Sequence, residues 1–134
     1  MRIEADVKVE NFASNSSSHW VGLIGRYTGN STFYTFAIDG AGDLRLLRST
    51  SNAASGAQCS TLTESLVVGQ WYHMRMDITG VQGNIHITTY LDGAPKHNCT
   101  ITGSNAFGPG RYGVVSYGST GTNGRYNNFT VSAP

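Results

Sequence analysis

The sequence predicts an all-β domain, either a sandwich or a barrel of antiparallel strands. About ten short segments alternate apolar and polar residues, as half-buried strands do. Clusters of Gly, Asn, Asp and Ser separate these segments, and the chain holds 17 Gly among its 134 residues. No long amphipathic helix pattern is visible. Many short strands with regular turns are typical of all-β domains.

The strands follow from the alternation, and their ends follow from turn residues. The first segment alternates charged positions such as Glu4 and Asp6 with apolar ones. Turn signals lie at 15–18, 28–30, 39–42, 80–83, 92–93, 108–110 and 118–124. The expected strands are 2–10, 20–27, 32–39, 44–49, around 60–67, 71–79, 85–91, 95–102, 111–117 and 125–132. Segment 49–58 has little apolar pattern, so we expect an exposed loop there.

Residues 71–93 form the clearest expected hairpin. Its apolar positions share one face, and the other face carries the rings and charges of His73, Arg75, Asp77, His86 and Tyr90. If Ile78 faces Ile85, then Asp77 lies opposite His86, His73 opposite Tyr90, and Arg75 opposite Thr88. An Asp–His pair either orients the imidazole toward a ligand and raises its pKa, or only stabilises the sheet.

Composition argues against some partners. The net charge is +1 and only 13% of residues are charged, so nothing indicates nucleic acid or an anionic membrane. No apolar run approaches the roughly 20 residues of a bilayer span. We expect a single domain over 1–134, cut from a longer chain.

The chain has two cysteines, Cys59 and Cys99. They are either two free thiols or a disulfide, and we expect the disulfide. It would place the protein in an oxidising compartment, secreted or at the cell surface.

Three pairs of stretches resemble the concanavalin A-like lectin and glucanase superfamily, in its laminin-G-like and carbohydrate-binding-module branches. They are GLIGRY at 22–27 with FYTFAID at 33–39, VGQWY at 68–72 with YLDG at 90–93, and GRYGV at 110–114 with NNFTV at 127–131. The resemblance covers most of the chain. It implies a jelly roll of two antiparallel sheets, one of them concave.

We expect a non-catalytic carbohydrate-binding module, a monomeric part of a larger chain, that binds a poly- or oligosaccharide on the concave sheet and adjoining loops. Charged side chains and histidine would hydrogen-bond sugar hydroxyls, and aromatic rings would stack on the apolar faces of the sugar. The expected binding residues are Asp6, Arg26, Arg45, His73 and Arg75, with stacking from Trp20 or Tyr90.

The other aromatic residues have expected places as well. Tyr34, Phe36, Tyr72 and Phe129 should pack inside, and Trp71 resembles a structural position of the family. Tyr112, Tyr117 and Tyr126 line a rim or cover the edge of the sandwich.

Two other classes of function remain open. A glycoside hydrolase would use Glu4 and Asp6, but the family's next carboxylate is missing, since positions 8 and 9 hold Lys8 and Val9. A laminin-G-type adhesion domain would bind protein instead. Calcium at Asp39, Asp43 or Asp92 is a habit of the family, and no spacing of residues here defines a ligand set.

Overall fold

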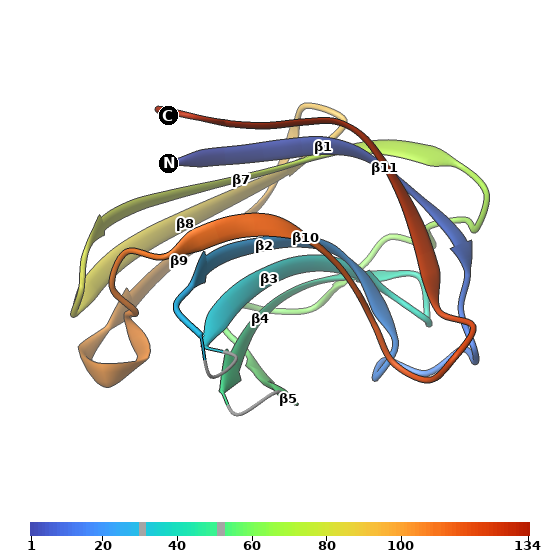
Figure 1. Ribbon diagram of the computed structural model, residues 1–134, viewed down its shortest axis with the longest axis horizontal. Helices are drawn as coiled ribbons and strands as arrows, with labels where there is room; N and C mark the ends of the chain where they lie inside the picture. Colours follow the sequence, from blue (N-terminus) through green and yellow to red (C-terminus); the bar gives the residue numbers. More distant parts are fainter. Residues whose placement is uncertain (30–31, 51–52) are drawn as a thin grey trace.

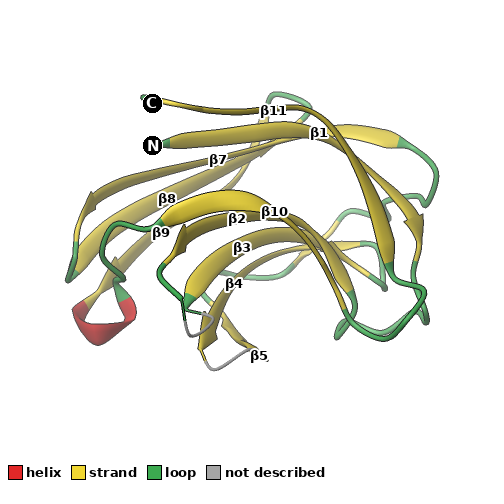
Figure 2. Ribbon diagram, viewed as in Figure 1, coloured by secondary structure: helices red, strands yellow, loops and turns green. Residues whose placement is uncertain are grey.

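Alternating apolar residues build strands along most of the chain in the computed structural model, which describes residues 1–29, 32–50 and 53–134. Figure 2 shows that strands dominate the fold. The strands are β1 (Arg2–Asn11), β2 (Trp20–Tyr27), β3 (Phe33–Asp39), β4 (Asp43–Thr50), β5 (Ala53–Ala57), β6 (Leu62–Thr63), β7 (Trp71–Val81), β8 (Asn84–Leu91), β9 (Ala94–Thr102), β10 (Arg111–Tyr117) and β11 (Asn123–Ser132). One short 3-10 helix, η1 (Gly103–Asn105), follows β9.

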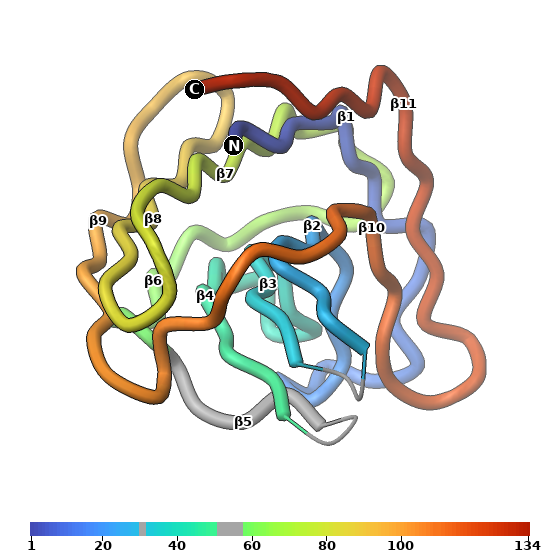
Figure 3. Tube along the Cα trace, turned by 60° about the vertical axis from the view of Figure 1, so that its left-hand side comes forward, coloured from blue at the N-terminus to red at the C-terminus, as the bar shows by residue number. Residues whose placement is uncertain are grey.

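The strands form a jelly-roll sandwich of two antiparallel sheets, as the family resemblance implies. The first, here called the β1 sheet, has the order β11-β1-β7-β8-β9. The second, the β2 sheet, has the order β10-β2-β3-β4-β5, and β6 also pairs with β4. Both sheets arch in the same direction, so the outer face of the β1 sheet is convex and that of the β2 sheet is concave (Figure 1). Along one side of the sandwich, β10 and β11 approach each other (Figure 3).

The core lies between the inner faces of the sheets. On β1 the apolar residues Ile3, Ala5, Val7 and Val9 are buried, while the charged residues between them face outward. The expected core positions of Tyr34, Phe36 and Tyr72 are confirmed. Phe129 is an exception and is largely exposed, because it lies on the edge strand β11 next to the left-handed residue Asn128.

Two expected elements differ in the structure. Segment 49–58 is not simply a loop, because β4 continues to Thr50 and β5 pairs with it. The strand expected around 60–67 is reduced to Leu62–Thr63. Residues 30–31, in or beside the turn expected at 28–30, and residues 51–52 of the expected loop lie outside the described residues.

The β7–β8 hairpin is confirmed, but its expected register is wrong by two residues. Ile78 lies opposite Ile87, because the strands continue to Val81 and Asn84 and leave a turn of only Gln82 and Gly83. A shift of two keeps every side chain on its expected face. It changes the partners, so Arg75 lies opposite Tyr90 and Asp77 opposite Thr88.

The expected disulfide between Cys59 and Cys99 is present, with 6.2 Å between the Cα atoms. It joins the segment between β5 and β6 to β9, and therefore links the two sheets. No helix within 1–29, 32–50 and 53–134 has the length and apolar character needed to cross a membrane.

Candidate functional site

The structure divides the expected binding residues among three places. Asp6, His73, Arg75 and Tyr90 lie on the convex face of the β1 sheet. Trp20 and Arg45 lie on the concave face of the β2 sheet, and Arg26 points between the sheets. The expectation of a single concave site containing all of them is therefore wrong. Alternation assigned each residue to a face of its own strand, but it could not tell which sheet that strand joins.

On the convex face, His73 lies between two carboxylates. Its Nδ1 is 2.9 Å from Asp6 Oδ1 and its Nε2 is 3.4 Å from Glu4 Oε2. The hydrogen bond to Asp6 raises the pKa of His73, and the hydrogen bond to Glu4 raises it by less. Partial desolvation lowers this pKa but does not outweigh the two hydrogen bonds. The pKa of Asp6 is lowered by His73 and by the amide of Asn128, which donates to Asp6 Oδ2 at 2.7 Å. A general acid needs a raised carboxyl pKa, so this arrangement disfavours that role for Asp6.

The rest of this face is held by paired charges. Burial acts to raise the pKa of Asp77, but hydrogen bonds from Arg75 and Arg2 outweigh it and lower that pKa to about 2. The Arg75 guanidinium lies over the Tyr90 ring, 4.2 Å from its centroid. Asp77 does not pair with His86, which instead lies 3.2 Å from Thr100 Oγ1.

Arg26 lies inside the sandwich rather than on its surface. Strict alternation would put it outside with Trp20 and Ile24, but the pairing of β2 with β10 shifts register there and its φ is +55°. The side chain is turned inward, and the residue is only 5% exposed. Its guanidinium donates to the carbonyl oxygens of Phe107 at 2.5 Å and Gly80 at 2.7 Å.

The concave face has a stacked aromatic pair at one end. The Tyr117 ring lies 4.6 Å from the Trp20 ring with 15° between their planes. Trp20 is only 1% exposed, which corrects its expected role as a surface ring, whereas Tyr117 is 38% exposed. Tyr117 was expected only at a rim or an edge. Tyr117 alternates with Val115 along β10, an edge strand of the β2 sheet. This alternation was the sequence signal that could have placed its ring on the outer face of the sheet.

Polar groups lie beside this pair. Arg45 donates from Nη1 to the Ser17 carbonyl oxygen at 3.0 Å, and its Nε is 3.9 Å from Asp39 Oδ2. The Asp39 carboxylate is buried, which raises its pKa, although it accepts the amides of Ala41 and Asp43. A cleft of about 370 Å³ opens here between Ser18–His19 and Tyr117–Ser119.

The remainder of the concave face is apolar. Tyr27 and Phe33 form a second aromatic pair at the other end of β2, with 5.9 Å between ring centroids. Between the two pairs lie Ile24, Ala37, Leu47 and Val115. Thr35 is fully buried, and its Oγ1 has no hydrogen-bond partner among the described residues. Ala37 and Leu47 are at most 2% exposed, so the part of this face that a ligand can reach lies at its partly exposed residues, Tyr117 above all.

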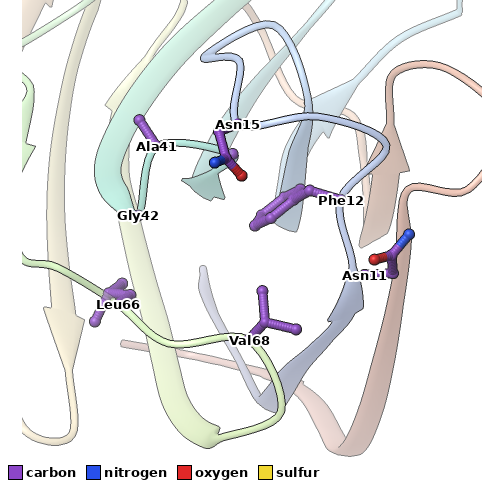
Figure 4. Close-up of a pocket in the computed structure, with 8 residues that line it drawn as sticks. Asn11, Phe12, Asn15, Ala41, Gly42, Leu66 and Val68 are labelled. Carbon is purple, nitrogen blue, oxygen red and sulfur yellow. The ribbon is translucent and has the colours of Figure 1, made fainter.

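Another pocket lies at the loop end of the sandwich. The Phe12 ring and Val68 face a space of about 330 Å³, with the amides of Asn11 and Asn15 at its margin and Ala41 and Leu66 on the far side (Figure 4). Asn11 is already engaged, since its Nδ2 donates to the Gly121 carbonyl oxygen at 2.8 Å.

The carboxylates considered for calcium, Asp39, Asp43 and Asp92, are engaged within the fold or on separate turns. Asp39 binds backbone amides of its own turn, and Asp92 Oδ1 accepts the His73 amide at 2.7 Å. Among the described residues, no three His, Cys, Asp or Glu side chains are grouped to hold a metal ion.

Comparison with solved structures finds a similar fold. No protein-family model and no curated protein sequence matches this chain. The structure is similar to that of the carbohydrate binding module CBM66 from Bacillus subtilis, with a TM-score of 0.71. The two sequences are 16% identical, and the match covers 96% of this chain and 71% of that one. A similarity at this identity shows a shared fold.

Proposed function

We propose that the domain is a non-catalytic carbohydrate-binding module that holds a poly- or oligosaccharide on the concave face of the β2 sheet. The observation that carries this proposal is the Tyr117 ring, which lies flat on Trp20 and exposes part of its surface on that face. A pyranose or furanose presents C–H groups that pack on such a ring. Trp20 fixes the ring in advance, so little conformational entropy is lost on binding.

The dimensions of the face suit a chain rather than a single sugar. From Trp20 to Tyr27, β2 spans roughly 23 Å at about 3.3 Å per residue. An aromatic pair lies at each end of this length, and Arg45 supplies guanidinium donors to hydroxyls near Tyr117. The glycan would therefore lie along β2 and contact the face at its two aromatic pairs, since Ala37 and Leu47 between them are at most 2% exposed.

Other observations favour this function over the alternatives. The fold is shared with a protein described as a carbohydrate binding module. The disulfide suits a secreted or cell-surface protein, where external polysaccharides occur. A hydrolase that uses Glu4 and Asp6 is disfavoured because the family's next carboxylate is missing at Lys8 and Val9, and the lowered pKa of Asp6 does not suit a general acid.

The test is affinity electrophoresis against a panel of soluble polysaccharides, together with pull-down on insoluble ones. The informative variant is Tyr117→Ile, because an apolar β-branched residue keeps Trp20 covered and suits a strand but offers no ring. Loss of the stacking ring should weaken binding about tenfold, equivalent to about 1.4 kcal/mol.

The matched control is Trp71→Ile, which removes a ring that is 46% exposed on the opposite, convex face. It should leave binding unchanged. The proposal fails if no polysaccharide binds. The concave site is wrong if Trp71→Ile weakens binding while Tyr117→Ile does not.

A further inference from the structure

Arg26 is not part of the concave site, and both its backbone conformation and the burial of its charge are unfavourable. A non-glycine residue at φ +55° is strained, and a guanidinium that is 5% exposed loses most of its hydration. Among the described residues it has no carboxylate partner, and its Nε has no hydrogen-bond acceptor. The buried guanidinium instead donates hydrogen bonds to the carbonyl oxygens of Gly80 and Phe107.

The segment that contains Phe107 is held by two further strands. The Tyr34 hydroxyl donates to the Asn105 carbonyl and accepts the Phe107 amide at 3.0 Å. The Arg48 guanidinium donates to the Asn105 side chain. Side chains from β2, β3 and β4 therefore all fix residues 105–107.

The same segment is also locked to the β7–β8 hairpin. The Gly83 amide donates to the Ala106 carbonyl at 2.9 Å, and the Gly103 amide donates to the Gly83 carbonyl at 2.9 Å. Loops rich in Gly, Ser and Pro normally keep some freedom at a surface. Here the loop after η1 and the hairpin turn are fixed to each other and to the sheet behind them. Such support is what a pre-organised binding site requires.

A pocket of about 500 Å³ opens over these two loops. Hydroxyl and amide groups come from Thr28, Thr32, Gln82 and Ser104, while Phe107 and Pro109 add apolar surface. None of the described residues that line the pocket carries a charge. In addition, the Phe107 carbonyl that accepts from Arg26 belongs to the same peptide group as the Gly108 N–H. A hydrogen bond to a cation polarises that group and strengthens the N–H as a donor.

We propose that this pocket is a second ligand site, which binds a neutral polyhydroxylated molecule of one or two sugar units. Hydroxyl, amide and backbone groups match sugar hydroxyls, and the lack of charge in the lining disfavours anionic ligands. The volume lies within the range of small-molecule pockets. Arg26, Tyr34 and Arg48 act as positioning residues, because they hold the loops and do not line the pocket. The pocket shares no lining residue with the cleft beside Tyr117, so variants in the pocket and at Tyr117 test the two proposals separately.

The test uses two-dimensional amide NMR with a panel of neutral mono- and disaccharides, up to about 20 mM, since a millimolar Kd corresponds to only about −4 kcal/mol. At least one sugar should shift the amides of Gly83 and Gly108. Gln82→Ala and Ser104→Ala change two exposed polar side chains of the lining. Each should weaken this binding at least about threefold, a loss equivalent to about 0.7 kcal/mol.

Gln70→Ala, an exposed amide elsewhere on the surface, is the matched control and should change nothing. Arg26→Lys should weaken sugar binding in the pocket without changing polysaccharide binding at Tyr117. The proposal is overturned if no sugar in the panel moves the two glycine amides. It is equally overturned if Gln82→Ala and Ser104→Ala both leave the titration unchanged, whatever the result at Tyr117.

Discussion

The imidazole of His73 has a carboxylate at each ring nitrogen, Asp6 at one and Glu4 at the other. Both contacts are hydrogen bonds only when the ring is protonated, because each nitrogen must then donate. The raised pKa of His73 reflects this preference for the charged form. The residue thus joins β1 to β7 on the convex face in a way that depends on pH.

We predict that His73 titrates above the ordinary histidine value near 6.5, and that Asp6→Asn lowers its pKa. The contribution of the pair to stability is complete below pH 6.5 as long as Asp6 stays ionised. It is lost as the pH rises through the folded-state pKa of His73, and again in acid as the pH falls through the lowered pKa of Asp6. NMR titration of the ring protons measures the shift directly. A folded-state pKa at or below 6.5 would contradict the arrangement, and Thr79→Ala on the same strand should leave it unaltered.

Trp20 and Arg26 show the limit of alternation at the residue scale. Alternation places both on the outer face of one strand, and the structure agrees for Trp20. It could not show that a ring from β10 covers Trp20, because that neighbour comes from far along the chain. Nor could it detect the register shift that turns Arg26 inward, since no glycine marks the position.

At the scale of elements, local patterns predict most of the strands. Nine of the expected segments correspond to strands within a few residues, because apolar alternation and turn residues are local signals. The strand pairing is different, since β1 lies between β7 and β11 through contacts that span most of the chain. The candidate site depends on this pairing. Alternation therefore places its residues on the correct faces of their strands, apart from Arg26, but it cannot show that the strands belong to different sheets.

The β7–β8 hairpin supplies a prediction at this scale. Gly80 has φ +90°, and a Cβ there would lie 2.4 Å from the Asn84 backbone oxygen. Gly69 has nearly the same φ, +86°, with open space around it. Gly69→Ala should cost about 1 kcal/mol of unfolding free energy from the dihedral alone. Gly80→Ala should cost clearly more, because the strands must also separate.

Urea denaturation of the two variants measures this difference. Each glycine is the control for the other, because both have nearly the same φ and only Gly80 lies close to a neighbouring backbone oxygen. Equal losses would mean that the hairpin backbone adjusts freely, and that the turn is less rigid than the packing of Gly80 implies.

At the scale of the whole molecule, the sandwich holds its two sheets together through the core and through one covalent link. Cys99 is buried on β9 at the edge of the β1 sheet, and Cys59 lies in the segment that leads from β5 to β6 of the β2 sheet. Nearby, His97 contacts Thr89 Oγ1 at 2.7 Å and the Ser60 carbonyl at 3.1 Å, and burial lowers its pKa. The disulfide and the neutral histidine therefore fix the same segment.

We predict that removing the disulfide lowers the unfolding free energy without removing the fold. The bridge spans 40 residues of sequence. For a loop of that length, constraint of the unfolded chain accounts for about 4 kcal/mol. The double variant Cys59→Ser with Cys99→Ser should show this loss in urea denaturation, and a reducing agent should reproduce it in the unaltered protein but have no effect on the variant. Neither cysteine lines the cleft beside Tyr117 or the pocket over the Arg26 loops, so ligand binding at both places should persist while the reduced protein stays folded. Unchanged stability in both experiments would show that the core alone holds the sheets together.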